Sequence, residues 1–217
     1  MKKKILIFAV PISIFIIIFS LLLFFNIPRV KYKYNPEKDS YFVAEVFGNA
    51  SSYEILDEYK GKLVTDIGVR AFYNHSNLKE IKLGKNVEYI NRLAFAECPK
   101  LEKINLENVK EISKNAFNYD TSLTEVNLDS IVNLGASVFL NTSLEKINFN
   151  DNTRLLSIGS LCFMNTNIKL ISIPKSCYFI GEDCFYNCKN LIQINVYGSL
   201  LKNNSYLKSL DIVNYID

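Results

Sequence analysis

The most reactive side chains of this chain belong to five cysteines, which could form disulfides or bind a metal ion. They are Cys98, Cys162, Cys177, Cys184 and Cys188. The last three lie close together in the sequence. They lack a fourth ligand, however, and the two closely spaced cysteine pairs that are typical of a structural zinc site. We therefore expect no metal site.

His75 is the only histidine and so the natural candidate for acid–base chemistry. Catalysis by a histidine requires a nucleophile and an orienting group within hydrogen-bond reach, and the spacing of the polar residues indicates neither. The eight glycines form no G-x-G-x-x-G or P-loop pattern that could hold a phosphate. The sequence thus predicts a protein that is not an enzyme and that uses no cofactor.

An internal repeat explains where these residues stand. The spacings between the phenylalanines that mark successive copies are 23, 22, 22, 24 and 22 residues. A fixed period of this size is typical of leucine-rich repeats, which stack as a solenoid. The marker residues are Phe72, Phe95, Phe117, Phe139, Phe163 and Phe185.

Each copy predicts one strand and one turn. In L-x-x-I-x-L segments such as Leu78 to Leu83, the last two apolar residues are two apart, as in a strand with one face inward. The A-F-x-x-C segment is too short for a helix and predicts a turn. Ordering ~22 residues costs ~1–2 kcal/mol each, whereas about seven buried apolar side chains return only ~1.5–3 kcal/mol each. A single copy cannot fold alone, so we expect a β-rich leucine-rich repeat solenoid with shared hydrophobic faces.

The repeat also assigns the cysteines to packing positions. Cys98 and Cys188 end the A-F-x-x-C segment, Cys162 and Cys184 stand at its alanine position, and Cys177 fills another apolar position. Buried free thiols behave as small hydrophobic groups. The alternative is a disulfide between Cys162 and Cys184, because neighbouring strands lie ~4.7–4.9 Å apart, within the Cα range of a disulfide.

The residues that alternate with the buried strand positions predict an exposed strand face. In solenoids such a face commonly lines the concave binding surface. Six strands at ~4.8 Å give a face about 25–30 Å long, enough for a peptide or a small protein. The alternative is a solvated polar face without a ligand. The candidate binding residues are Glu80, Lys82, Lys103, Asn105, Glu125, Asn127, Lys146, Asn148, Ser172, Gln193, Asn195 and Tyr197.

The chain before the repeats predicts a membrane anchor. Residues 1–4 are a basic head, and residues 5–25 contain no charged side chain. As a helix this segment would be about 31 Å long, enough to span a hydrocarbon core of ~30 Å. We expect an uncleaved transmembrane helix; a cleaved signal peptide is the alternative, although no A-x-A-like site follows. Residues 26–40, with prolines and mixed charges, predict a juxtamembrane linker.

The leucine-rich repeat domain is expected to comprise residues 41–217. Within it, residues 41–66 form an N-terminal cap, residues 67–196 form six repeats, and residues 197–217 form a C-terminal cap. Caps are required because the end copies of a solenoid have no neighbour. The last apolar residues fit either one truncated strand or a short helix over residues 205–215.

The charge distribution bears on partners and on orientation. The basic residues before Lys31 are Lys2, Lys3, Lys4 and Arg29, which leaves 21 basic and 22 acidic residues in the rest of the chain. This near-neutral part lacks the basic stripe of nucleic-acid-binding proteins, so we expect no nucleic-acid partner. The short basic head favours a cytoplasmic N-terminus with the repeats outside the cell.

The pattern I-G-x-x-A-F-x-x-C-x-x-L-x-x-I-x-[LI]-P resembles the BspA-type, or treponemal-type, leucine-rich repeat. Segments that match it are Ile158-Gly159, Ala94-Phe95, Cys98, Ile173-Pro174 and Ile180-Gly181. The resemblance implies a surface or secreted protein of bacteria or some protists, associated with adhesion and protein binding, and no catalytic residues. The chain departs from the pattern because only Pro174 fills the proline position and because no wall-anchoring module is evident.

These observations together predict a single-pass protein of the cell membrane with an extracellular repeat domain. Its strand face would bind a protein or peptide, or mediate adhesion. The alternative is a non-catalytic envelope scaffold that self-associates through a poorly capped end. The sequence does not indicate which ligand is bound.

Overall fold

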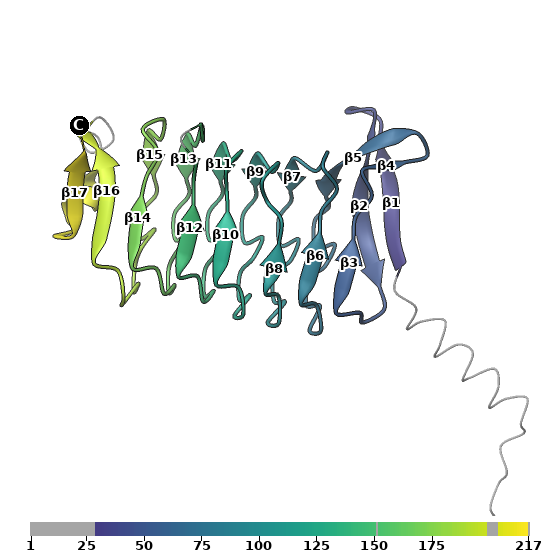
Figure 1. Cartoon of the computed structure of the whole chain (residues 1–217), viewed down its shortest axis with the longest axis horizontal. Helices are drawn as coiled ribbons and strands as arrows, with labels where there is room; N and C mark the ends of the chain where they lie inside the picture. Colours follow the sequence, from purple (N-terminus) through teal and green to yellow (C-terminus); the bar gives the residue numbers. More distant parts are fainter. Residues whose placement is uncertain (1–28, 151, 199–203, 217) are drawn as a thin grey trace, which may run out of the picture.

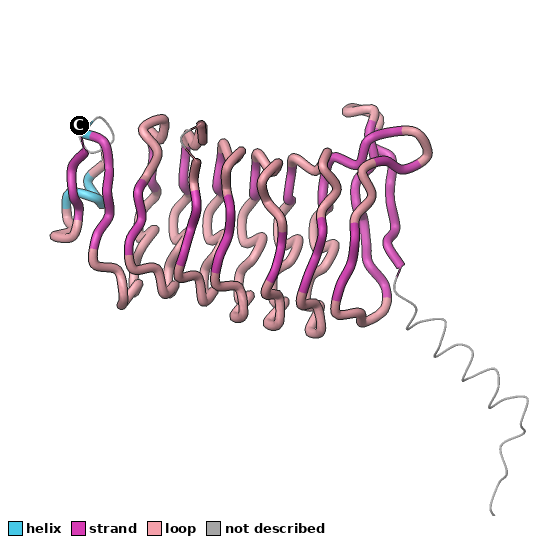
Figure 2. Tube along the Cα trace, in the orientation of Figure 1, coloured by secondary structure: helices cyan, strands magenta, loops and turns pink. Residues whose placement is uncertain are grey.

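The computed structural model describes residues 29–150, 152–198 and 204–216. They form a β-solenoid in which successive copies contribute strands to two rows (Figure 1). Loops and turns connect the strands throughout, and the helix among the described residues lies at the C-terminal end (Figure 2). The predicted β-rich solenoid is therefore confirmed.

The first row is one sheet with strand order β1-β2-β5-β7-β9-β11-β13-β15, to which β4 adds beside β5. The sequence did not predict this row, because most of its strands are two residues long and show no alternation of apolar and polar residues. The β1–β2 and β4–β5 pairs are antiparallel and the others are parallel. The strands are Arg29–Asn35 (β1), Ser40–Phe47 (β2), Glu58–Tyr59 (β4), Lys62–Ile67 (β5), Tyr89–Ile90 (β7), Glu111–Ile112 (β9), Asn133–Leu134 (β11), Ser157–Ile158 (β13) and Phe179–Ile180 (β15).

The second row contains the strands that the L-x-x-I-x-L segments predict. It is divided into three parallel sheets, β3-β6-β8, β10-β12 and β14-β16-β17. The pairs are parallel because every copy runs round the solenoid in the same direction. The strands are Ser52–Glu54 (β3), Glu80–Lys82 (β6), Lys103–Ile104 (β8), Glu125–Asn127 (β10), Lys146–Asn148 (β12), Leu170–Ser172 (β14), Gln193–Tyr197 (β16) and Val213–Ile216 (β17).

The phenylalanine turns hold neighbouring copies together without forming strands. Residues two before and two after each marker phenylalanine have positive φ angles, such as 61° at Asn115 and 65° at Tyr119 around Phe117. This left-handed backbone is costly for residues other than glycine. It directs the amide of Phe117 to the carbonyl of Val138 in the next copy, at 3.0 Å. Hydrogen bonds between copies therefore offset the strain.

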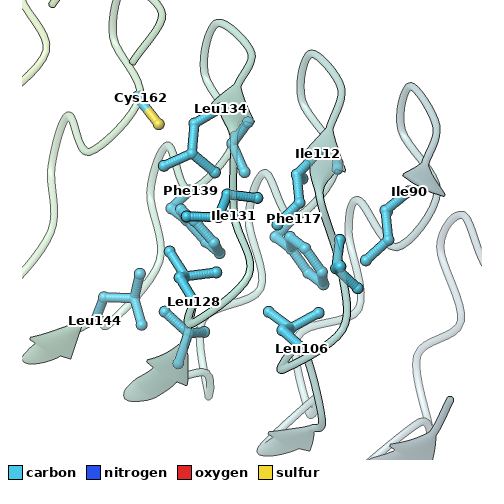
Figure 3. Close-up of a cluster of buried hydrophobic side chains, with 14 of the residues drawn as sticks. Ile90, Leu106, Ile112, Phe117, Leu128, Ile131, Leu134, Phe139, Leu144 and Cys162 are labelled. Atoms are coloured by element: carbon cyan, nitrogen blue, oxygen red, sulfur yellow. The ribbon is translucent and has the colours of Figure 1, made fainter. Parts of the chain in front are cut away.

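The side chains of these turns fill the interior. Phe117 stacks between Phe95 and Phe139, with ring centroids 5.2 and 5.4 Å apart. Figure 3 shows Phe117 between Ile112 from the first row and Leu106 beside the second row, and all three are at most 1% exposed. The core is thus a continuous column of apolar layers, as the repeat period predicts.

The cysteines belong to this interior. All five are buried and carry free thiols, and Figure 3 shows Cys162 among the buried side chains. The alternative disulfide between Cys162 and Cys184 is not formed. Both residues instead pack as small hydrophobic groups that are 0% exposed.

The N-terminal cap begins earlier than the sequence predicts. Where residues 26–40 suggest a linker, Arg29–Asn35 forms β1 and pairs with β2 as a hairpin. Val30 and Tyr32 pack against the hydrophobic core, which holds β1 in place. The predicted transmembrane segment, residues 5–25, lies outside the described residues. No helix within the described ranges is long and apolar enough to cross a bilayer.

In the C-terminal cap, side chains form the hydrogen bonds that the backbone of a following copy would otherwise form. Helix α3 (Ser205–Lys208) is a single turn, and β17 then pairs with β16. Asn204 Nδ2 donates to the carbonyl of Ile180 at 2.7 Å, and the Tyr206 hydroxyl accepts the amide of Phe185 at 2.9 Å. In earlier copies the equivalent groups bond to backbone of the following copy. The two sequence interpretations of this end were each correct in part, since the cap contains both a short helix and a strand.

Candidate binding face

The predicted binding residues lie together on one face of the second row. We use "strand face" for the outward side chains of β6, β8, β10, β12, β14 and β16 together with Asn105, which follows β8. Each of the twelve residues is exposed or half-buried, as predicted. Their inward neighbours Ile81, Val126 and Ile194 are at most 2% exposed. The alternation of these strands therefore sets the outward register.

Cross-strand ion pairs order the N-terminal part of the strand face. Lys82 Nζ lies 2.6 Å from Glu54 Oε1, and Lys146 Nζ lies 2.8 Å from Glu125 Oε1. Asn148 Nδ2 also donates to Glu125 Oε1 at 2.7 Å. The hydrogen bond from Lys146 is the main cause of the lowered pKa of Glu125, and the one to Glu54 raises the pKa of Lys82. Such exposed pairs contribute little to stability, but they fix where these charges lie.

Lys103 lies in the same part of the face without a counterion. It is directly opposite Glu80 across β6 and β8, yet no carboxylate of the described residues lies within 4.0 Å of its ammonium group. Glu80, Glu102 and Glu107 likewise take part in no ion pair there. These residues are exposed and therefore available to charged groups of a ligand.

A hollow of about 620 Å³ opens among these charges. It lies where β8 and β10 are not paired, and Ile104 of β8 is consequently half-buried instead of buried. The hollow thus combines an apolar floor with a charged rim in which carboxylates outnumber ammonium groups. Its charged lining residues are Glu80, Lys82, Glu102, Lys103, Glu107 and Glu125.

The C-terminal part of the strand face is uncharged. Leu170 and Ile192 are 49% and 72% exposed. Asn195 Nδ2 donates to Ser172 Oγ at 2.9 Å, and Asn214 Nδ2 donates to Asn195 Oδ1 at 3.0 Å. This row of side-chain hydrogen bonds therefore extends from β14 and β16 onto β17, beyond the predicted binding residues. Apolar contact and amide hydrogen bonds are what this part can offer a ligand.

The last position of the A-F-x-x-C segment forms a polar column that is buried except at the half-buried His75. The sequence did not single out three of its members, Asp120, Thr142 and Thr166. Asp120 is 0% exposed and follows Cys98 by one period. Its Oδ1 accepts the amide of Cys98 at 2.8 Å, while its Oδ2 has no hydrogen-bond partner among the described residues. Burial raises the pKa of Asp120 well above its usual value. The column consists of His75, Cys98, Asp120, Thr142, Thr166 and Cys188.

The hydrogen bonds of the histidine and the cysteines indicate structural roles in the interior. His75 Nε2 lies 3.0 Å from the Tyr53 hydroxyl, and burial lowers the pKa of His75. Cys98 Sγ donates to the carbonyl of Phe72 at 3.1 Å. Burial raises the pKa of Cys177 to about 11, so this thiol is protonated at neutral pH. Within the described ranges no group of three or more histidine, cysteine or acidic side chains could hold a metal ion.

Comparison with solved structures places the fold among bacterial proteins. The T. pallidum leucine rich repeat protein TpLRR is 23% identical, with a TM-score of 0.57 over 76% of this chain and 68% of its own. A leucine rich cell surface protein from Faecalibacterium prausnitzii A2-165 is 25% identical, with a TM-score of 0.61 over 78% of this chain and 54% of its own. The pneumococcal vaccine antigen PcpA is 19% identical, with a TM-score of 0.61 over 81% and 51%. This chain thus spans about half the length of the last two.

The sequence itself matches one repeat family. No curated protein matches the chain. The family described as "BspA type Leucine rich repeat region (6 copies)" matches residues 44–157 and 156–208. This match extends over most of the chain and includes the phenylalanine column and the strand face, whereas β1 and β17 lie outside it. The chain belongs to the BspA-type leucine-rich repeat family.

Proposed function

We propose that the strand face binds a protein or peptide, and that the hollow around Lys103 is the centre of the site. The observation that carries this proposal is the unpaired ammonium group of Lys103 beside the half-buried Ile104, in a hollow of about 620 Å³. Repeats of this kind generally present binding surfaces instead of catalytic groups. We therefore propose a non-catalytic role. We expect the ligand to place an acidic group against Lys103, basic groups against the unpaired carboxylates of Glu80, Glu102 and Glu107, and an apolar residue against Ile104.

The proposed location is the outer surface of a cell membrane. The uncharged segment of residues 5–25 supports an anchor, and the basic head supports extracellular repeats. The similar protein from Faecalibacterium prausnitzii is a cell surface protein, which is consistent with this location. A membrane-impermeant amine label applied to intact cells should modify lysines between Lys60 and Lys208. Labelling only after lysis would contradict an extracellular repeat domain.

Peptides selected from a displayed random library against the full chain test the binding proposal. Lys103→Glu should weaken their binding about tenfold, equal to ~1.4 kcal/mol. Lys114→Glu is the matched control, because it makes the same charge change at an exposed lysine of a phenylalanine turn. Binding that is insensitive to Lys103→Glu, or that both substitutions weaken equally, would contradict a site in the hollow.

The alternative of a self-associating scaffold receives less support. It requires a poorly capped end. At the C-terminal end, however, Asn204 and Tyr206 form hydrogen bonds with the backbone carbonyl of Ile180 and the backbone amide of Phe185. Light scattering with size-exclusion chromatography separates the two proposals. Oligomers that grow with protein concentration would favour the scaffold.

A further inference from the structure

The N-terminal cap carries a cluster of aromatic rings that is not part of the core column. Tyr32 of β1 stacks on Tyr59 of β4, with centroids 4.6 Å apart. Tyr41 of β2 meets the ring of Tyr59 edge-on at 5.0 Å and the ring of Tyr34 at 5.5 Å. We call these four residues the tyrosine cap. They lie at the end of the stack opposite β16 and β17 (Figure 1).

Lysines and an exposed leucine adjoin the tyrosine cap. Lys60 Nζ lies 5.5 Å from the Tyr59 ring, and Lys62 Nζ lies 5.7 Å from the Tyr34 ring. Lys62 also forms an ion pair with Asp39, which accepts a hydrogen bond from the Tyr34 hydroxyl. Tyr34 is 44% exposed, and Leu63 is 45% exposed. Tyrosine and lysine each combine an apolar body with a polar tip, and both favour the interface between lipid and water.

The position of the tyrosine cap in the chain points to the same partner. The uncharged segment ends at Phe25 and β1 begins at Arg29. Four residues reach at most ~14 Å even when extended. The headgroup layer outside the hydrocarbon core is roughly 5–8 Å deep on each side. If residues 5–25 span a membrane, β1 must begin within or directly beside the headgroups.

We infer that the tyrosine cap lies in the headgroup region of the bilayer that the N-terminal segment crosses. This inference rests on the proposed membrane anchor. The ring of Tyr34, the exposed member of the tyrosine cap, enters the interface, and the ammonium groups of Lys33 and Lys60 contact lipid phosphates. No carboxylate of the described residues pairs with either of these lysines. Such docking holds the solenoid in a fixed orientation and directs its far end away from the membrane.

The absence of tryptophan from the chain allows a direct test. Tyr34→Trp introduces a single fluorescent reporter into the full chain, reconstituted in vesicles of phosphatidylcholine and phosphatidylglycerol. Brominated acyl chains in these vesicles should remove most of its emission. Tyr186→Trp is the matched control, because Tyr186 is 59% exposed and follows β15, which lies seven strand spacings from β1. At ~4.8 Å each these amount to about 34 Å.

A charge variant and an extraction step complete the test. Combining Lys33→Glu and Lys60→Glu with Tyr34→Trp should reduce the quenching. Retention of the chain in the vesicles after alkaline washing, without quenching at position 34, would reject the docking and leave the anchor intact. Equal quenching at positions 34 and 186 would also reject it, since the solenoid would then lie flat. Release on alkaline washing would reject the anchor, and the docking inference with it.

Discussion

Two columns of side chains run along this solenoid and follow opposite rules. The phenylalanine column repeats one buried residue in six copies, with rings stacked 4.9–5.7 Å apart. The strand-face column changes from charged to uncharged residues along the same stack: Glu80, Lys103, Glu125, Lys146, Leu170 and Gln193. Both columns stand on the same backbone repeat. The repeated packing of the same buried ring therefore stabilises the interior. The exposed residues of the strand face can differ between copies, and so serve recognition, with little effect on stability.

The largest effect is expected inside the phenylalanine column. Phe117→Ala removes a ring that stacks on both sides and should lower the free energy of unfolding by ~3–5 kcal/mol in urea titrations. Phe185→Ala is the comparison, because among the described residues its ring stacks only on Phe163. The loss in the free energy of unfolding should be smaller for Phe185→Ala than for Phe117→Ala. A loss below ~1 kcal/mol at Phe117 would show that the inward register is wrong.

The buried polar column is an intermediate case, because it is interior but not uniform. The raised pKa of Asp120 means that the folded chain holds its proton more tightly than the unfolded chain. Its contribution to stability is therefore greatest below the unfolded pKa of ~3.9 and is lost as the pH rises toward the folded pKa.

Asp120→Asn removes this dependence and keeps an oxygen for the amide of Cys98. The variant should be more stable than the natural chain at neutral pH by ~1–3 kcal/mol, and the difference should shrink near pH ~4. Urea titrations at the two pH values measure it, with Glu80→Gln as an exposed control. A difference that does not depend on pH would mean that folding does not raise the pKa of Asp120.

The end of the phenylalanine column gives a smaller effect. Tyr206→Phe removes the hydroxyl that accepts the amide of Phe185 and should cost about 1 kcal/mol. Hydrogen exchange at Phe185 should accelerate, whereas exchange in the central copies should not change. Tyr186→Phe, at an exposed tyrosine of the same copy, is the control. Unchanged exchange at Phe185 would show that α3 does not act as the cap.

On the strand face the effect on stability should be smallest. Lys103→Glu should leave the free energy of unfolding unchanged within ~0.5 kcal/mol, as for most surface substitutions. The urea titration used for Phe117→Ala measures this directly. A loss comparable to that of a core substitution would mean that the two columns do not divide stability from recognition.

The sequence predicts the parts of this structure that repeat with a clear period. The spacing of the phenylalanines and the L-x-x-I-x-L alternation are sufficient for the solenoid, for the inward residues such as Ile81, and for the outward position of Lys103. The first row of strands was missed because pairs such as Tyr89–Ile90 are too short to alternate. Strand β1 was missed because its charged and proline-flanked sequence resembles a linker, and only packing of Val30 and Tyr32 on the core reveals it.

The candidate site was predictable in outline but not in detail. Alternation places the charges on one face, but it cannot show which of them are paired. Lys82 and Lys103 both alternate with buried strand residues, yet only Lys82 has a counterion within 4.0 Å among the described residues. The gap between β8 and β10 that exposes Ile104 likewise depends on pairing across copies. Asp120, in contrast, could have been found by extending the period from Cys98.

A reciprocal charge exchange tests the central claim most directly. A selected peptide whose acidic residue is replaced by lysine should lose affinity for the natural chain and regain it for Lys103→Glu, because the opposite charges are again in contact. Affinities of the four combinations give the coupling between the two side chains. A favourable coupling of ~1 kcal/mol or more is the predicted result. Coupling near zero, with the peptide still bound, would show that the ligand does not contact Lys103 and that the hollow is not the centre of the binding site.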